Sequence, residues 1–216
     1  MRKSSYLISF FAVAILLTLN VISAHYPDWL VETGPDLPYT KVTVRYGLME
    51  RCERQIVSIP GPDGGKIEYN DYKCRPWPAR VADGCEEENR YMCIAWTSAT
   101  YVTELGVGFA SVALVAILFG ISTHSRRRRI WRAVASLVAL HAGLQIVAFS
   151  LITDVYHKSE YPGFKHARPS TSYVLNVVDW AASLFVVGGV VVTGISADAG
   201  HKWAAGNRAY QPIRGE

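Results

Sequence analysis

The sequence predicts an α-helical membrane protein with four transmembrane helices and a small extracellular antiparallel β-sheet. Its apolar residues fall into four blocks, each about as long as the ~20 residues that cross a ~30 Å hydrocarbon core. All four cysteines lie in the polar stretch between the first two blocks, and a short arginine-rich link joins the second block to the third. The predicted spans are residues 6–24, 94–121, 130–153 and 173–196.

The first apolar block leaves two interpretations open. Arg2 and Lys3 precede it and Ala24 ends it, which is also the pattern of a signal peptide cleaved after that alanine. The run is longer than a usual signal core and carries Asn20 late within it, so a retained helix is the favoured interpretation. In both cases His25 and the residues that follow it lie outside the cytoplasm.

The distribution of basic residues predicts the orientation of the helices. The link at 122–129 is expected to stay in the cytoplasm, because short links rich in arginine are retained there. With four helices, the N-terminus at 1–5 and the tail at 197–216 are then cytoplasmic, the loops at 25–93 and 154–172 are extracellular, and the plasma membrane is the expected location. A second interpretation is that the arginines bind anionic lipid, at about 1 kcal/mol each. The arginines concerned are Arg126, Arg127, Arg128, Arg129 and Arg132.

The long first loop predicts a β-hairpin. β-Branched residues and alternation mark 41–58, a dense proline and glycine turn follows over 59–65, and alternation resumes over 66–72. A sheet of this size has a thin core of its own and needs further stabilisation.

The cysteines supply candidate cross-links for this loop. Cys52 and Cys74 lie in the two arms of the hairpin, and Cys85 and Cys93 would close a smaller loop just above the second span. Closing a loop of about twenty residues stabilises by ~3 kcal/mol in the chain-entropy model. Four cysteines allow three pairings, of which the sequential one is favoured because the hairpin brings the first two close. Such bonds persist in an oxidising compartment, in agreement with the orientation from the arginines.

One motif resembles that of a known family. Trp29 lies just beyond the first span, Gly47 and Leu48 follow, and then come Cys52 and Cys74. This order resembles the claudin and peripheral myelin protein superfamily, whose outer loop carries a tryptophan, a Gly-Leu-Trp motif and two disulfide-bonded cysteines. The resemblance implies a left-handed four-helix bundle beneath the sheet, with Trp29 and the glycine motif at the border between sheet and bilayer. The chain has Met49 where the family has its second tryptophan. In its overall sequence character the chain is more similar to claudin-like tetraspans of fungi.

Four polar residues in the last three predicted spans are candidate site residues. Glu104 and His141 lie near the middle of the bilayer, Gln145 is one turn from His141, and Asp179 is about two turns below the outer end of its helix. An ionisable group at this depth is costly unless it is paired or faces water. The favoured interpretation is structural, with Glu104 protonated or paired with His141. The alternative is a site that handles protons or ions.

Composition and motifs also bear on function. The net charge is +4 without a basic stripe interleaved with aromatics, so no nucleic acid is expected as a partner. No strong metal spacing, nucleophile turn or phosphate-binding glycine loop is present, so neither enzyme activity nor a cofactor is expected. We expect lateral or trans protein contacts in cell-surface organisation or adhesion, with the lipid bilayer and a membrane protein or a second copy as partners. The alternatives are an auxiliary subunit of a channel or transporter and an ion- or proton-conducting protein.

Overall fold

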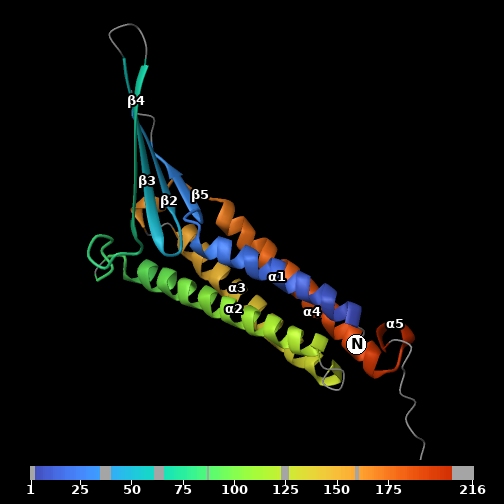
Figure 1. Ribbon diagram of the computed structural model, residues 1–216. Coiled ribbons are helices and arrows are strands. Elements are labelled where there is room, and N and C mark those ends of the chain that lie inside the picture. Colours follow the sequence, from blue (N-terminus) through green and yellow to red (C-terminus); the bar gives the residue numbers. More distant parts are fainter. Residues whose placement is uncertain are drawn as a thin grey trace, which may run out of the picture. The chain divides into compact units, whose positions relative to one another are not determined.

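Four long helices account for most of the chain. The computed structural model describes residues 3–34, 40–60, 66–86, 88–122, 127–158 and 161–205. Each long helix has the length and apolar composition to cross a membrane, and each extends a few residues past its predicted span. The prediction of a multi-pass helical membrane protein is therefore confirmed. The helices are α1 (Lys3–His25), α2 (Arg90–Ser122), α3 (Arg127–Lys158) and α4 (Thr171–Asp198), with a short α5 (Lys202–Ala205) after them (Figure 1).

A five-stranded antiparallel sheet joins the two long loops. Its strand order is β4-β3-β2-β1-β5, so the last strand, from the loop before α4, pairs with the first strand, from the loop after α1. The β3–β4 hairpin extends beyond the end of β2 (Figure 1). The strands are β1 (Leu30–Thr33), β2 (Thr40–Tyr46), β3 (Glu50–Pro60), β4 (Lys66–Pro76) and β5 (Ala167–Pro169).

The sheet is larger than the predicted hairpin. The expected first arm, 41–58, divides into β2 and β3 at a tight turn, in which the Gly47 amide donates to the Glu50 carbonyl at 2.8 Å. A Cβ on Gly47 would lie 2.6 Å from the Cα of Pro27, so only glycine fits this close backbone approach. The turn was expected over 59–65, but its first two residues belong to β3. The rest of the turn at 61–65 and the end of the tail at 206–216 lie outside the described residues.

The chain forms two compact units, which are described separately. The helical unit comprises Met1–Leu19, Leu105–Gln145 and Val178–Glu216. The sheet unit comprises Asn20–Glu104 and Ile146–Val177. Each unit therefore contains segments of all four long helices, and only the sheet unit contains strands.

The helical unit packs aromatic rings against glycines. A Cβ on Gly120 of α2 would lie 2.8 Å from the ring of Tyr6 on α1, and one on Gly194 of α4 would lie 2.3 Å from the ring of Trp131 on α3. Small residues let helix backbones approach where lipid supplies no hydrophobic drive between them. The core around these contacts includes Val13, Ala113, Ile117, Val134, Val138 and Val190.

Candidate functional site

The motif tryptophan fastens the end of α1 to the base of the sheet. Trp29 is fully buried, and its indole Nε1 donates to the Ser23 carbonyl at 2.7 Å. Its backbone amide donates to the Tyr46 carbonyl at 2.8 Å, and its ring meets Tyr173 edge to face, with centroids 6.3 Å apart. Trp29 is therefore a structural core residue rather than an exposed interfacial aromatic.

The turn between β2 and β3 is fixed to the outer end of α2. Trp96 donates from its indole nitrogen to the Gly47 carbonyl at 3.0 Å, and the hydroxyl of Thr100 donates to the Leu48 carbonyl at 3.0 Å. Leu48 is buried. These bonds fix the membrane-proximal end of the sheet, so the opposite end of the β3–β4 hairpin is its outer tip.

Two disulfides hold the sheet unit together, in the sequential pairing that the sequence favours. Cys52 of β3 and Cys74 of β4 are directly opposite, with Cα atoms 4.0 Å apart. Cys85 and Cys93 join the loop after β4 to the first turn of α2. These bonds indicate that this part of the chain faces an oxidising compartment.

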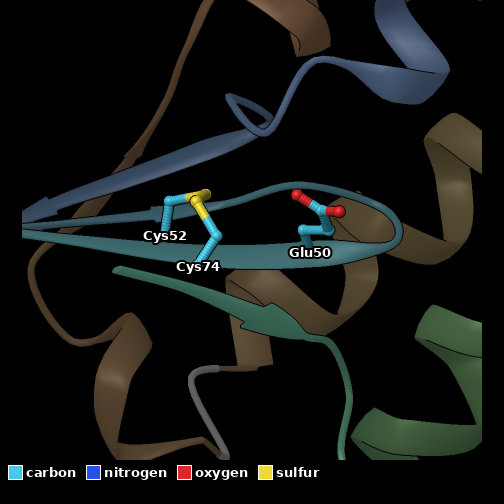
Figure 2. Close-up of side chains that lie close together, drawn as sticks. All are labelled: Glu50, Cys52 and Cys74. Carbon is cyan, nitrogen blue, oxygen red and sulfur yellow. A yellow bond between two sulfur atoms is a disulfide. The ribbon is translucent and has the colours of Figure 1, made fainter. Parts of the chain in front are cut away.

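Glu50 lies beside the first disulfide, as Figure 2 shows, and the three side chains are close enough to suggest a metal site. Cysteine binds a metal ion only as a free thiolate, however. Because Cys52 and Cys74 are bonded to each other, only the exposed Glu50 carboxylate remains, and the arrangement does not bind a metal.

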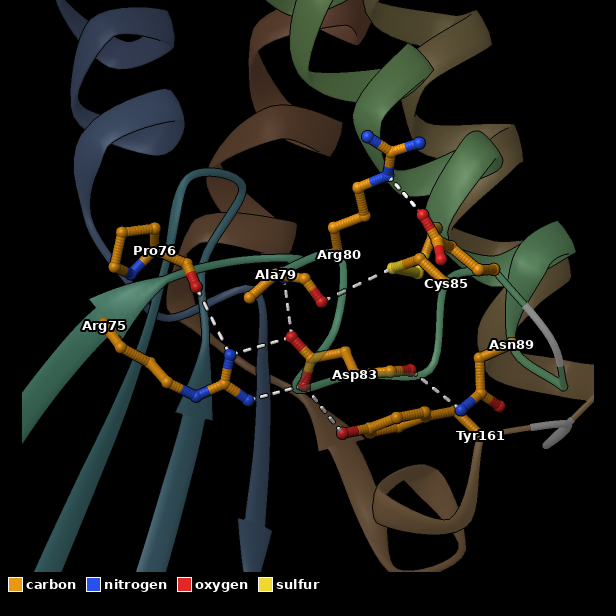
Figure 3. The surroundings of a disulfide bond; sticks show 10 residues. Arg75, Pro76, Ala79, Arg80, Asp83, Cys85, Asn89 and Tyr161 are labelled. Atoms are coloured by element: carbon orange, nitrogen blue, oxygen red, sulfur yellow. Dashed lines mark hydrogen bonds and ion pairs between the residues drawn. A yellow bond between two sulfur atoms is a disulfide. The ribbon is translucent and has the colours of Figure 1, made fainter.

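A buried carboxylate organises the loop between β4 and α2. The guanidinium of Arg75 makes two bonds to Asp83, at 2.7 and 2.5 Å, and the Ala79 amide donates to the same carboxylate at 2.6 Å (Figure 3). The Tyr161 hydroxyl also donates to it, at 3.4 Å. Burial alone would raise the pKa of Asp83, but these donors outweigh burial and hold the pKa below its usual range. The carboxylate is therefore ionised and fully used in fixing the loop.

An aromatic cluster fills the space between the sheet and the outer helix ends. The Tyr46 ring lies 5.1 Å from Trp77 and 5.1 Å from Phe164, and Trp77 meets Trp96 edge to face at 5.9 Å. Such ring pairs add about 0.5–1.5 kcal/mol each beyond their buried area. Burial raises the pKa of Tyr46, so its phenol stays neutral. This cluster of Tyr46, Trp77, Trp96 and Phe164 therefore forms a rigid base, which holds one end of the sheet in place.

The opposite end of the sheet is exposed and partly apolar. β2 pairs with β3 only as far as Val57, so the tip of the β3–β4 hairpin is a two-stranded ribbon. Its side chains are more than half exposed at Ile59, Ile67 and Tyr69. Tyr72, further down β4, is 56% exposed. Exposed aromatic and aliphatic groups on a rigid scaffold are typical of protein-contact surfaces.

In the helical unit, an imidazole on α3 bridges α2 and α4. His141 Nδ1 lies 3.0 Å from the Gly106 carbonyl, and Nε2 lies 3.1 Å from Asp179 Oδ2. The side chains of His141 and Asp179 are both 0% exposed. The predicted partner, Glu104, is exposed instead. The partner of His141 is therefore Asp179, and the other expectation for Glu104, that it is protonated, stays a prediction.

The two contacts fix the orientation of the imidazole. Because a carbonyl oxygen can only accept, Nδ1 of His141 donates to Gly106. Nε2 is then the nitrogen that faces the Asp179 carboxylate. Pairing the two side chains reduces the cost of burying each of them inside a membrane.

Gln145 lies one turn from this imidazole and is also buried. A Cβ on Gly106 would lie 2.3 Å from Gln145 Nε2, so the glycine lets α3 approach α2 closely. Of the four predicted intramembrane polar residues, three are therefore buried, and two of these form an ion pair.

The predicted arginine group lies at the start of α3. Arg126 falls outside the described residues, whereas Arg127, Arg128 and Arg129 begin the helix. Arg132 is 3.6 Å from the Asp198 carboxylate and lies over the Trp131 ring. The first contact is an ion pair and the second a cation–π contact, and both lie within the helical unit.

Two candidate regions follow from this geometry, namely the outer sheet with its exposed hairpin and the buried His141–Asp179 pair. Sequence reasoning found both intramembrane residues but missed Arg75 and Asp83, because nothing in a polar loop marks two charges eight positions apart as partners. Membership of the claudin superfamily stays a prediction. The sequence matches no protein-family model and no curated protein.

Proposed function

We propose that this chain is a claudin-like protein of the plasma membrane that joins membranes by pairing the β4 edges of two copies. Its termini are cytoplasmic, its cysteine-rich loop is extracellular, and its helices form a left-handed bundle. The observation that carries the proposal is the free edge of β4. This strand has eleven residues and ends the sheet, and in the described part of the chain no strand pairs with its outer side.

Some backbone N–H and C=O groups of β4 point outward, as such pairing requires. Cys52 and Cys74 have Cα atoms only 4.0 Å apart, which is the spacing of a non-hydrogen-bonded antiparallel pair. The amide and carbonyl of Cys74 therefore point away from β3, and those of Tyr72 and Asn70 do the same, since the direction alternates along a strand. An edge with free donors and acceptors is a template for another strand.

The side chains of β4 complement those of a second copy in one antiparallel register. A two-fold axis through Tyr72 places Asp71 opposite Lys73 twice, once on each side of the axis. These positions would be non-hydrogen-bonded pairs, in which side chains approach most closely. Opposite charges facing each other across strands contribute about 0.2–1 kcal/mol per pair.

Neighbouring symmetric registers are disfavoured. Residues that point their backbone groups outward must face one another across the two-fold axis. The axis can therefore pass only through a residue, and neighbouring symmetric registers place it one residue further along β4. An axis through Asp71 places two Asp71 carboxylates opposite each other, and an axis through Lys73 does the same with two ammonium groups. Like charges directly opposite destabilise a strand pair. The charges of β4 therefore select the register centred on Tyr72.

Antiparallel pairing also sets the relation between the two membranes. The Pro76 end of β4 is next to the buried base at Trp77, and the Lys66 end is at the outer tip. In an antiparallel pair each base lies beside the tip of the partner. The two copies then belong to apposed membranes, so the contact is adhesive.

The test is clustering of proteoliposomes in two colours. Wild-type vesicles are expected to cluster with one another. Asp71→Lys and Lys73→Asp should each abolish clustering of like vesicles, because each places like charges opposite each other. Vesicles carrying Asp71→Lys should cluster with vesicles carrying Lys73→Asp, since those two edges are complementary again.

The matched control is Lys41→Asp, which reverses an exposed charge on β2 away from the edge. Its vesicles should cluster like wild type, and all variants should keep both disulfides on a non-reducing gel. Clustering that ignores both edge substitutions, or a mixed population that does not recover, would overturn the proposal. Wild-type vesicles that stay apart while another membrane protein co-purifies in stoichiometric amount would instead support an auxiliary subunit.

A further inference from the structure

We infer that a groove beside the second disulfide binds one zwitterionic phospholipid of the outer leaflet. The groove lies within the sheet unit, between the loop after β4 and the outer end of α2, and has a volume of about 610 Å³. This inference does not depend on adhesion. The groove is lined by Pro78, Arg80, Cys85, Glu86, Arg90, Cys93, Ile94, Thr97, Ser98 and Tyr101.

One wall of the groove is a continuous face of α2. The lining residues from Arg90 to Tyr101 recur at the three- and four-residue spacing that places side chains on one side of a helix. Tyr101 lies about 16 Å further along the helix than Arg90. Ile94 is 56% exposed and Tyr101 is 68% exposed, and both belong to a helix that can cross a membrane. We expect the apolar part of this wall, at Ile94 and Tyr101, to face the acyl region of the bilayer.

The other wall is a rigid overhang at the level of the lipid headgroups. The loop after β4 is tied to α2 by the Cys85–Cys93 disulfide and to β4 by the paired charges of Arg75 and Asp83. A site that is already ordered loses little conformational entropy when its ligand binds. The overhang thus covers the top of an apolar wall that continues into the membrane.

The charges of the overhang have both signs. Arg80 and Arg90 carry guanidinium groups suited to a phosphate, and Glu86 carries a carboxylate suited to an ammonium group. Arg80 and Glu86 lie 2.7 Å apart and are both largely exposed. A zwitterionic headgroup can replace both partners of this ion pair, with its phosphate on Arg80 and its ammonium on Glu86, whereas a purely anionic headgroup bound to Arg80 leaves Glu86 without a cation. We therefore assign phosphatidylcholine-type rather than anionic lipid.

The experiment is native mass spectrometry of the full chain, released from detergent after incubation with dioleoylphosphatidylcholine or dioleoylphosphatidylglycerol. Wild type should retain one phosphatidylcholine in preference to phosphatidylglycerol. Thr97→Trp fills the groove and should weaken phosphatidylcholine binding by at least about tenfold, which corresponds to ~1.4 kcal/mol. Glu86→Gln should raise the share of phosphatidylglycerol, because it removes the repelling carboxylate.

The control is Val112→Trp, which adds the same side chain at an exposed position of α2 outside the groove. It should bind lipid like wild type, and both tryptophan variants should retain two disulfides. Equal retention of phosphatidylcholine by Thr97→Trp and wild type would overturn the inference. A preference of wild type for phosphatidylglycerol would also overturn it.

Discussion

Removal of one partner from the His141–Asp179 pair should have unequal consequences. In His141→Leu, the buried Asp179 carboxylate loses the imidazole that lies 3.1 Å from it. Removing one partner of a buried pair in this way costs about 3–5 kcal/mol. In Asp179→Leu, the remaining imidazole keeps its bond to the Gly106 carbonyl. Only the contact itself is lost, at about 1–2 kcal/mol.

The assay is equilibrium unfolding of the full chain in mixed micelles at pH 7. The double variant, with leucine at both positions, should cost less than the sum of the single variants, because neither buried group is then left without the other. Leu140→Ala, at an exposed neighbouring position, is the control and should shift stability by no more than about 0.5 kcal/mol. Additive effects together with equal single-variant penalties would refute the coupling of His141 with Asp179.

Four further outcomes are expected in the sheet unit. Arg75→Ala should destabilise it by about 2–3 kcal/mol, less than a fully buried pair because the arginine is one-third exposed, as measured by thermal unfolding. Because the pKa of Asp83 is lowered, wild-type tryptophan fluorescence should stay constant from pH 7 to 5 and change only as the pH falls below 3.8. Cys52→Ala should remove ~3 kcal/mol and sharply reduce protein at the cell surface; unchanged surface labelling would contradict this. Gly47→Ala should cost about 1–3 kcal/mol from overpacking, and a wild-type melting temperature would contradict the close approach.

The transmembrane helices could be predicted because a bilayer imposes a minimum length on any apolar helix. The hairpin arms could be predicted from their alternation and turn residues. In contrast, β1 and β5 have only four and three residues. Strands this short carry no periodic signal, and only their pairing in the folded chain defines them, β1 with β2 and β5, and β5 with β1. The turn at Gly47 was missed for a related reason, since its close approach to Pro27 is a tertiary contact.

The error at Glu104 has a different cause. Depth along a helix follows from counting residues, and the count places Glu104 and His141 deep in the predicted spans. Depth does not give the direction of a side chain around the helix axis. Gly106, whose carbonyl contacts His141, is two residues from Glu104, which is about 200° around a helix. Glu104 therefore lies on the opposite side of α2, and Asp179 takes its place as the partner.

The two edges of the sheet differ in a way that makes β4 the edge available for pairing. β5 has three residues and ends in Pro169, which has no amide to donate, so it is a poor template for another strand. β4 is long and has no proline before its last residue. The backbone N–H of Asn70 points away from β3. Asn70→Pro should therefore remove one outward backbone donor while leaving the β3–β4 ladder intact.

This substitution separates pairing from folding. Asn70→Pro should abolish vesicle clustering while keeping both disulfides and a stability within about 1 kcal/mol of wild type, as is typical of proline on an edge strand. Asp71→Pro removes a backbone N–H that bonds to β3. This variant should instead lower stability by about 3 kcal/mol or more. If Asn70→Pro vesicles cluster as strongly as wild type, the β4 edge is not the adhesive surface, because no antiparallel partner centred on Tyr72 keeps all of its hydrogen bonds in that variant.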